Sequence, residues 1–253
     1  MPIELRGNYL SILKSVHRER VPRTYVEIGL FTGDSFSLAR RQTLAVGIDP
    51  APRFRHRLPK RAKVYETTSD EFFADHDLRK LLGGPVDVAF IDGMHHFEFA
   101  LRDFRNLERH AASASVILVH DCYPPSPEWT SREPRPGPWA GDVWRLLACL
   151  EKYRPDLRVV LAPASPSGLG IVGGLDPDNR ELFERYDEIV EETMSLAFTD
   201  YEPSNVVPPN WSSAAHLFPG PYRRRGVLEG TSYRVRRLSR RTPARSLVKW
   251  ARR

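Results

Sequence analysis

The feature that most constrains the fold of this chain is an alternation of seven short apolar runs with helix-patterned segments between residues 24 and 174. Short runs rich in β-branched residues are typical of strands buried on both faces. Strands that alternate with helices form parallel sheets covered by helices. The sequence therefore predicts an α/β fold with a mostly parallel seven-stranded sheet. The predicted strands are 24–28, 43–48, 63–66, 86–91, 116–119, 157–161 and 169–172.

The length of 253 residues suits one large domain with a basic extension. We expect an amphipathic helix within residues 1–22, the domain proper over 23–200, and a Pro-rich linker and tail over 201–253. No run approaches 18 apolar residues and no leader pattern opens the chain, so a cytoplasmic protein is expected. Two cysteines do not indicate a disulfide framework.

The net charge of +6 is unevenly distributed. Residues 223–253 contain eleven Arg and one Lys against one Glu, a net charge of +11, which leaves −5 on the rest of the chain. Because apolar residues lie among these arginines, we expect the tail to contact an anionic membrane surface or nucleic acid. The alternative is a solvated extension, or a contact between copies in a homo-oligomer.

A glycine turn follows the first predicted strand, in the sequence Glu27–Ser35. The dinucleotide-binding fingerprint is excluded because Phe31 stands where its second glycine belongs, and the lysine of a phosphate-binding loop is absent. Residues 168–173 match the dinucleotide pattern letter for letter, but they lead into Asp176-Pro177 and are interpreted as a strand. We therefore expect the turn to bind a different kind of ligand, or to be a structural tight turn that binds no ligand.

The pattern acid-x-Gly-x-x-x-Gly, with Ser35 two residues later, resembles motif I of class I S-adenosylmethionine-dependent methyltransferases. The resemblance implies a Rossmann-like fold and a crevice for S-adenosylmethionine, whose cationic aminoacyl end would pair with Glu27. Asp49 lies 20 residues after Gly29, a position suited to ribose hydroxyls. Ser69 and Asp70 would reach the adenine, although capping of the next helix explains them almost as well. The expected cofactor-binding residues are Glu27, Gly29, Thr32, Gly33, Ser35, Asp49, Ser69, Asp70 and Asp92.

Two further acids, Asp92 and Asp121, directly follow the fourth and fifth predicted strands. Neighbouring parallel strands end at the same edge of a sheet, so these carboxylates are expected to lie close together. Like charges at that distance repel, which predicts a bridging cation, and Mg²⁺ prefers such oxygen ligands. His95 lies beside them and is a candidate general base at neutral pH. The alternative for Asp92 is a helix N-cap only.

The sequences I-D-G-x-x-H and V-H-D-x-Y around these acids resemble metal-dependent O-methyltransferases that act on sugars and natural products. Over residues 24–174, the resemblance implies that Asp92 and Asp121 are metal ligands and that His95 is the base. His120 departs from the pattern, since sugar-modifying relatives commonly have an acid there. It is either a third metal ligand, which favours a softer ion such as Mn²⁺ or Fe²⁺, or a sign of a weakened site.

The expected reaction is methyl transfer from S-adenosylmethionine to a hydroxyl of a small-molecule or glycan acceptor. A Pro-rich segment, 123–140, directly follows Asp121 and is expected to be a lid over the acceptor, with Trp129 and Trp139 available for stacking. A nucleophilic Cys122 is a minor alternative. Two rival functions remain at this point: an RNA-directed methyltransferase that uses the basic tail, and a non-methylating member of the fold.

Overall fold

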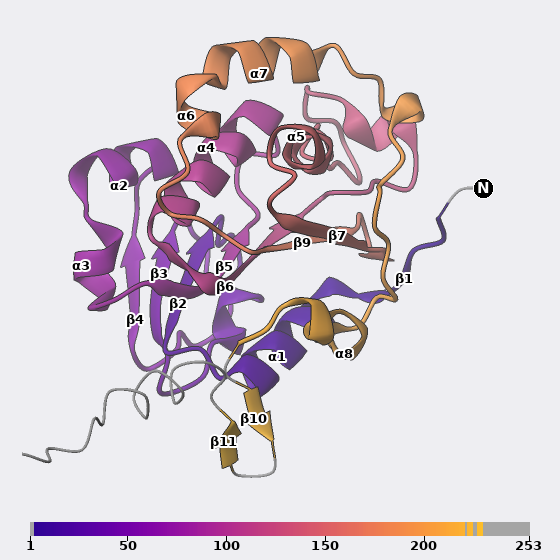
Figure 1. Cartoon of the computed structure of the whole chain (residues 1–253). Helices are drawn as coiled ribbons and strands as arrows, with labels where there is room; N and C mark the ends of the chain where they lie inside the picture. The colour runs from indigo at the N-terminus through magenta and orange to yellow at the C-terminus, as the bar shows by residue number, and fades with distance from the viewer. Residues whose placement is uncertain (1–2, 221, 225–226, 230–253) are drawn as a thin grey trace, which may run out of the picture.

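A central seven-stranded sheet organises this computed structural model, which describes residues 3–220, 222–224 and 227–229 (Figure 1). The strand order is β4-β3-β2-β5-β6-β9-β7, and β9 runs antiparallel to both of its neighbours while the other pairs are parallel. The predicted fold class and its strands are confirmed. The strands are β2 (Thr24–Ile28), β3 (Leu44–Ile48), β4 (Ala62–Tyr65), β5 (Val86–Ile91), β6 (Ala111–His120), β7 (Arg158–Ala162) and β9 (Leu169–Gly173).

Helices cover both faces of the sheet, and the core is correspondingly divided into two layers. Helices α2 to α7 pack on one face, while α1 and α8 pack on the other. Strands enclosed in this way bury both of their faces, which explains the continuous apolar runs in the sequence. The helices are α1 (Tyr9–Arg20), α2 (Ser69–Asp75), α3 (Leu78–Leu82), α4 (Phe97–Arg109), α5 (Arg145–Tyr153), α6 (Glu181–Glu184), α7 (Tyr186–Met194) and α8 (Trp211–Ala214).

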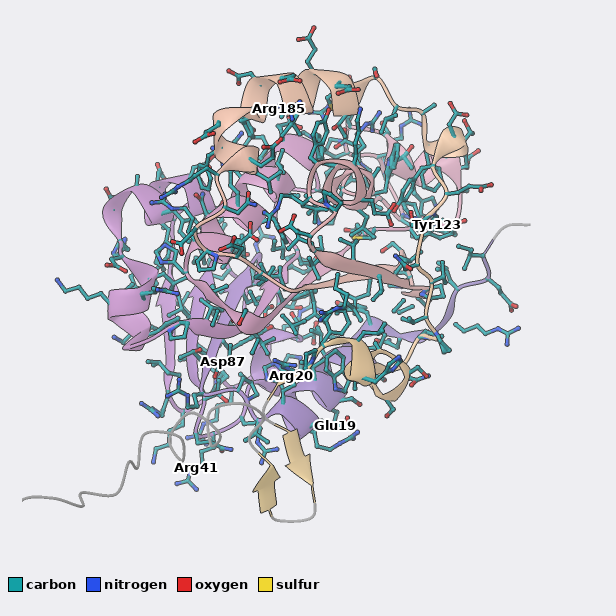
Figure 2. The ribbon with its side chains drawn as sticks, viewed as in Figure 1. Glu19, Arg20, Arg41, Asp87, Tyr123 and Arg185 are labelled. Carbon is teal, nitrogen blue, oxygen red and sulfur yellow. The ribbon has the colours of Figure 1, made fainter. Side chains whose placement is uncertain are left out.

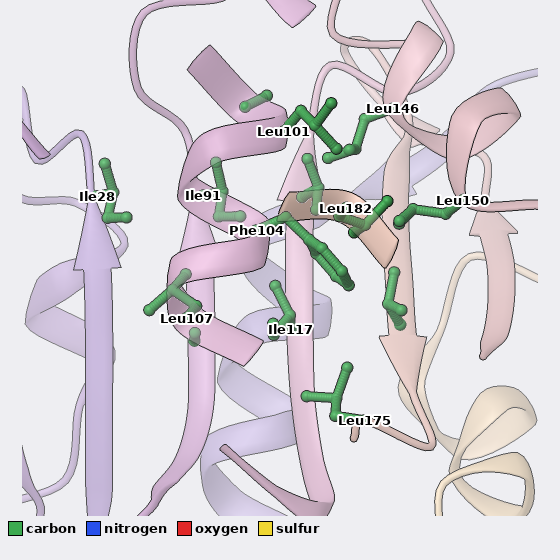
Figure 3. Packing of buried hydrophobic residues seen from close by; sticks show 14 of the residues in the cluster. Ile28, Ile91, Leu101, Phe104, Leu107, Ile117, Leu146, Leu150, Leu175 and Leu182 are labelled. Carbon is green, nitrogen blue, oxygen red and sulfur yellow. The ribbon is translucent and has the colours of Figure 1, made fainter. Parts of the chain in front are cut away.

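Helix α4 shows how the sequence pattern produces the core. Leu101, Phe104 and Leu107 recur at the spacing of one helix face and are fully buried. Figure 3 shows them above Ile91 and Ile117 of the sheet, with residues of α5 and α6 alongside. The helix therefore fixes the segment before it, residues 92–96, at the carboxyl end of β5.

Three local elements differ from the sequence prediction. The sequence pattern of residues 35–40 predicts a helix, but the structure has a single 3₁₀ turn, Phe36–Leu38, because the hydroxyl of Ser35 donates to Glu27 and no described side chain caps the turn. The apolar pattern after Asp178 predicts one helix, which the structure divides into α6 and α7 at Arg185. The N-terminal helix begins only at Tyr9, after a short strand, β1 (Arg6–Asn8), that pairs with β8 (Ala164–Ser165).

Residues 201–220 pack against the domain, whereas the sequence predicts a linker there. Trp211 and Phe218 are fully buried, and Arg20 of α1 donates to the carbonyl oxygen of Phe218 at 3.0 Å. Two short strands, β10 (Tyr222–Arg224) and β11 (Val227–Glu229), follow as an antiparallel pair. The rest of the predicted basic tail, and its expected membrane or nucleic-acid contact, lies outside the described residues.

The sequence predicts a ligand-binding site at the carboxyl ends of the parallel strands. Tyr123 follows the end of β6 and Asp87 stands near the start of β5, and Figure 2 shows how far apart these two ends lie. Ligands of open α/β sheets bind beyond the carboxyl ends. Within residues 3–220 and the two short strands that follow, no helix is both long and apolar enough to cross a bilayer.

Candidate active site

The glycine turn after β2 lies in direct contact with the segment after β5. Gly29 has φ +85°, and a Cβ at this position would lie 1.9 Å from the carbonyl oxygen of Asp92. Gly33 has φ +80°, and its Cβ would lie 2.8 Å from the ring of Phe54. Any other residue at Gly29 would be strained and would clash with backbone. Glycine therefore allows the turn and the Asp92 segment to form two walls of one crevice.

Asp49, at the end of β3, holds the glycine turn in place. Its Oδ2 accepts hydrogen bonds from the backbone N–H groups of Leu30 at 2.7 Å and Phe31 at 2.9 Å, while Oδ1 accepts from Ala51. Phe31 has φ +40°, so these bonds also stabilise an uncommon backbone conformation. Oδ1, which accepts only one of these bonds, can accept a further one, so the predicted contact with ribose hydroxyls is compatible with this arrangement.

Glu27 is fully buried beneath the turn. Its carboxyl group accepts hydrogen bonds from the hydroxyls of Tyr25, at 2.6 Å, and Ser35. Burial raises the pKa of Glu27 to about 8, although both hydroxyls act to lower it. Ser35 lines the central cavity but Glu27 does not. In this structure, Glu27 therefore supports Ser35 and does not face the ligand space predicted for it.

The structure brings together Asp92, His95 and Asp121, as the sequence predicts. Nδ1 of His95 lies 2.9 Å from Oδ2 of Asp121, and its Nε2 lies 3.7 Å from Oδ1 of Asp92. Each of the three residues offers one ligand atom, and these atoms lie within 4.8 Å of one another. Burial lowers the pKa of His95, but the two carboxylates outweigh burial and raise it above the usual value. The cluster can hold one divalent cation or move one proton.

His120 lies between the two carboxylates, a place that its sequence position alone does not reveal. Its Nδ1 is 3.1 Å from Oδ1 of Asp92 and 3.3 Å from Oδ1 of Asp121. Despite burial, these charges raise the pKa of His120 well above its usual value. In turn, His120 and His95 outweigh the burial of Asp121 and lower its pKa. A protonated His120 therefore offsets the repulsion between the acids, while its buried Nε2 has no hydrogen-bond partner among the residues that the structure describes.

A cavity of about 640 Å³ opens over this cluster and the glycine turn. Four aspartates line it and no Lys or Arg does, so among the described residues its charge is negative. That charge suits a cationic ligand and disfavours phosphate groups. The lining residues are Tyr9, Gly29, Leu30, Phe31, Thr32, Asp34, Ser35, Asp49, Asp92, Gly93, Met94, His95, His120, Asp121, Trp129, Pro138, Trp139, Pro166 and Ser167.

Sequence reasoning missed two residues of the cavity wall. Tyr9 belongs to the apolar face of α1 in the sequence, but its ring packs against His120 with centroids 4.1 Å apart. Ser167 follows β8, and its hydroxyl donates to Oδ1 of Asp121. The pairing of β1 with β8 carries both residues to the site, and neither strand has a recognisable pattern in the sequence.

The residues after β4 lie outside the cavity lining. Thr68 caps α2 in a capping box with Glu71, so the cap is neither Ser69 nor Asp70. Asp70 forms a bidentate ion pair with Arg102 of α4, with an N···O distance of 2.7 Å. The structure thus gives Asp70 a tertiary partner, and contact with adenine stays a prediction for both residues.

The other candidates at the strand ends have structural partners. Asp92 does not cap α4, since Asp142 accepts the hydrogen bond of the first helical N–H, that of Phe97, at 2.8 Å. His96 bonds the carbonyl oxygen of Arg132 at 2.8 Å. Cys122 is buried, and burial raises its pKa, so it remains a thiol and is unsuited to nucleophilic attack.

The Pro-rich segment 123–140 forms one wall of the cavity and is fixed by ion pairs. Arg132 bridges Glu98 of α4 and Asp142, with its closest N···O distances at 2.5 Å and 2.6 Å. Trp139 donates from Nε1 to the carbonyl oxygen of Ser131 at 2.6 Å. The predicted lid is therefore anchored over α4 in this structure.

Residues 26–122 match the sequence profile of a family described as a methyltransferase domain. Among curated proteins, none is similar to the chain in sequence. The cofactor-bound protein Rv0187 from MTB is 18% identical, with a TM-score of 0.51 over 70% of this chain and 83% of its own. A protein from Klebsiella pneumoniae, provisionally named an O-methyltransferase, is 11% identical, with a TM-score of 0.51 over 67% and 81%. These two similarities show a shared fold.

A third structure is the O-methyltransferase TomG from Streptomyces achromogenes in complex with S-adenosylmethionine. It is 16% identical, with a TM-score of 0.49 over 64% of this chain and 78% of its own. The profile match covers the glycine turn, Asp49, Asp92, His95 and Asp121. The methyltransferase interpretation of the sequence is thus confirmed at the level of the domain.

Proposed function

We propose that this chain, whose residues 26–122 match a methyltransferase domain, transfers a methyl group from S-adenosylmethionine to a hydroxyl of an uncharged sugar, glycoside or natural-product acceptor. The observation that carries this proposal is the convergence of Asp92, His95 and Asp121 beside the glycine turn, in one cavity that four aspartates and, among the described residues, no Lys or Arg line. The negative lining complements the sulfonium and ammonium groups of the cofactor. It does not favour a phosphate-bearing acceptor such as RNA.

The cofactor would lie against the glycine turn and Asp49, where Thr32 and Ser35 also line the cavity. The acceptor would approach from the side of Trp129 and Trp139, whose rings suit the apolar face of a sugar or an aromatic ring. Its hydroxyl oxygen attacks the methyl carbon of the sulfonium while the carbon–sulfur bond breaks. The products are the methyl ether, S-adenosylhomocysteine and one proton.

His95 would take that proton at Nε2. Asp121 faces Nδ1 at 2.9 Å and orients the ring, in the way that a carboxylate orients a histidine base in other enzymes. The position at the edge of the cavity leaves the ring accessible to the acceptor. Sequence position alone indicates His95 as a candidate, and the distance to Asp121 supplies the reason for the role.

Asp92 and Asp121 would hold a divalent cation, with His95 as the nearest nitrogen ligand, while His120 faces the same carboxylates through Nδ1. The close set of ligand atoms from Asp92, His95 and Asp121 fits such an ion. When bound, the ion would lower the pKa of the acceptor hydroxyl and help to orient it. Without the ion, protonated His120 already offsets the charge of the two acids, so metal dependence needs a direct test.

Calorimetry with S-adenosylhomocysteine tests the cofactor site. We expect saturable binding by the full chain and at least tenfold weaker binding by Asp49→Asn, since its single amide oxygen cannot accept the bonds of the turn N–H groups and that of Ala51 together, and its amide lacks the negative charge of the carboxylate. Asp75→Asn, at an exposed position of α2, is the matched control and should bind as the wild type does. Absence of binding by the wild type would contradict the proposal.

Chelation tests the cation. With labelled S-adenosylmethionine and a panel of hydroxyl-bearing glycosides and phenols, we expect EDTA to reduce methyl transfer by about 100-fold, a loss typical of a metal that activates a nucleophile. Mg²⁺ or Mn²⁺ should restore transfer by the wild type and by Asp75→Asn, but not by Asp121→Asn. Transfer that persists in EDTA would rule out metal assistance and leave the His95 and His120 pair as the acid–base system.

A further inference from the structure

His95 has a backbone conformation that residues with a side chain rarely adopt. Its φ is +57°, in the left-handed region. The conformation places the imidazole beside Asp121 and at the edge of the cavity. A residue held in such a conformation needs surroundings that fix it. The surroundings of His95 come from the end of the Pro-rich segment, residues 139–142.

Three contacts from that segment hold His95. The backbone N–H of Asp142 donates to the carbonyl oxygen of His95 at 3.2 Å. Gly141 has φ +61° and passes so close that a Cβ there would lie 1.8 Å from the same oxygen. The ring of Trp139 stacks on the imidazole with centroids 5.0 Å apart and planes 8° from parallel. Backbone and ring are therefore both fixed by one short stretch of chain.

The segment is itself immobilised. Asp142 is fully buried, and its side chain accepts from the N–H of Phe97 at the start of α4 while pairing with Arg132 and Arg145. The wall that would contact the acceptor and the residue that would take its proton are thus parts of one rigid unit. No motif in the sequence indicates this connection.

We infer that Trp139, Gly141 and Asp142 are positioning residues that set the imidazole of His95 for proton transfer. The inference rests on the proposed function and extends it by linking the acceptor wall to the base. A base displaced by about 1 Å can lose about 100-fold in rate. The network should therefore influence the rate of the chemical step more than the binding of either substrate.

Two glycines close in sequence, one before residues 139–142 and one within them, provide a matched test. Gly141→Ala and Gly137→Ala both replace a glycine of positive φ, but only at Gly141 would the new Cβ meet His95, since nothing lies within 4 Å at Gly137. With the best acceptor from the panel above, we expect Gly141→Ala to lower kcat by about 100-fold. Its affinity for S-adenosylhomocysteine should remain that of the wild type, and Gly137→Ala should keep the wild-type kcat. Equal kcat values for the two variants would overturn the inference.

Trp139 gives an independent comparison, because it tests stacking and leaves the backbone unchanged. Trp139→Ala should lower kcat more than it raises the KM of the acceptor, and Trp139→Phe should restore most of the loss by providing another ring. If Trp139→Ala raised only the KM of the acceptor and left kcat unchanged, Trp139 would be a simple acceptor contact, which would contradict its positioning role.

NMR of the full chain separates this inference from the proposed function. The ring current of the stacked indole should shift the Cε1 and Cδ2 proton signals of His95 upfield. These signals are assigned by their disappearance from the spectrum of His95→Gln. Trp139→Ala and Gly141→Ala should move these signals, while Gly137→Ala should leave them in place. The measurement needs no acceptor and no metal, so it decides the positioning of His95 even if methyl transfer fails. Unmoved signals in Gly141→Ala would refute the inference.

Discussion

At the scale of single residues, the site depends on buried carboxyl groups whose charge is controlled by a few neighbours. Glu27 is enclosed beneath the glycine turn and has only two hydroxyls as partners, so burial dominates its titration. Asp121 is equally buried but faces two imidazoles, and it stays ionised. Two buried carboxyl groups of the same domain therefore differ in charge at neutral pH, a difference set by their partners.

The raised pKa of Glu27 predicts a specific dependence of stability on pH. The folded state keeps the proton up to a pKa of about 8, whereas an unfolded glutamate loses it near 4.5. The stabilisation from this group is therefore fully present below pH 4.5 and is lost as the pH rises through 8. The loss is about 1.4 kcal/mol for each unit by which the folded and unfolded pKa values differ. We expect urea unfolding of the wild type between pH 6.5 and 8.5 to show this fall.

Glu27→Gln is the matched comparison for that measurement, since its amide resembles the protonated carboxyl group. The fall in unfolding free energy over this pH range should be smaller in Glu27→Gln than in the wild type. His17, whose pKa burial lowers to about 4, contributes equally to both proteins, so its titration cancels in the comparison. Parallel pH profiles for the two proteins would disprove the assignment.

Particular residues show what the sequence can predict. Gly29, Asp92 and Asp121 follow strands with clear apolar patterns, and parallel strands deliver their ends to one edge, so their convergence is predictable. Ser69 and Asp70 follow an equally clear strand, yet a capping box and the partner Arg102 decide where they lie. Tyr9 and Ser167 reach the site through a two-stranded sheet too short to leave a pattern, so long-range pairing hides them from the sequence.

At the scale of elements, the Pro-rich segment serves as a braced wall of the cavity. Its bracing centres on Arg132, whose guanidinium pairs with Glu98 of α4 and with the buried Asp142. A bidentate ion pair that reaches a buried carboxylate is worth more than an exposed surface pair. Sequence patterns indicate a long irregular segment, but only the contacts show that it is fixed to α4 and thereby to His95.

Arg132→Gln should loosen this wall without unfolding the domain. Loss of the ion pairs should increase the rate of limited proteolysis within 123–140 by several-fold, while the cooperative unfolding transition shifts by only about 1–2 kcal/mol. Arg135→Gln alters an exposed arginine of the same segment and serves as the control. Cleavage at the same rate in both variants would show that Arg132 does not hold the wall.

At the scale of the whole molecule, the domain is completed by segments far apart in the sequence. The match to a methyltransferase domain over residues 26–122 runs from strand β2 to strand β6 of the central sheet, while β7 and β9 lie beyond it. The face opposite α4 is covered by α1 from the N-terminal part and by α8 from residues 211–214. Arg20 connects these two coverings through the carbonyl oxygen of Phe218. Residues 201–220 are therefore structural, although their Pro-rich composition predicts a linker.

Truncation tests this division of the chain. A protein ending at residue 200 loses the side chains of Trp211 and Phe218, which are 1% and 2% exposed, and leaves the guanidinium of Arg20 without the Phe218 carbonyl. Removal of large buried side chains costs about 3–5 kcal/mol each, a large part of the stability of a typical domain. We expect the 1–200 protein to unfold at a much lower temperature, or to fail to fold, while a 1–229 protein keeps the unfolding temperature and the S-adenosylhomocysteine affinity of the full chain. Equal unfolding temperatures for the 1–200 and 1–229 proteins would instead make residues 201–220 the linker that their composition suggests, and would place the whole core within residues 3–200.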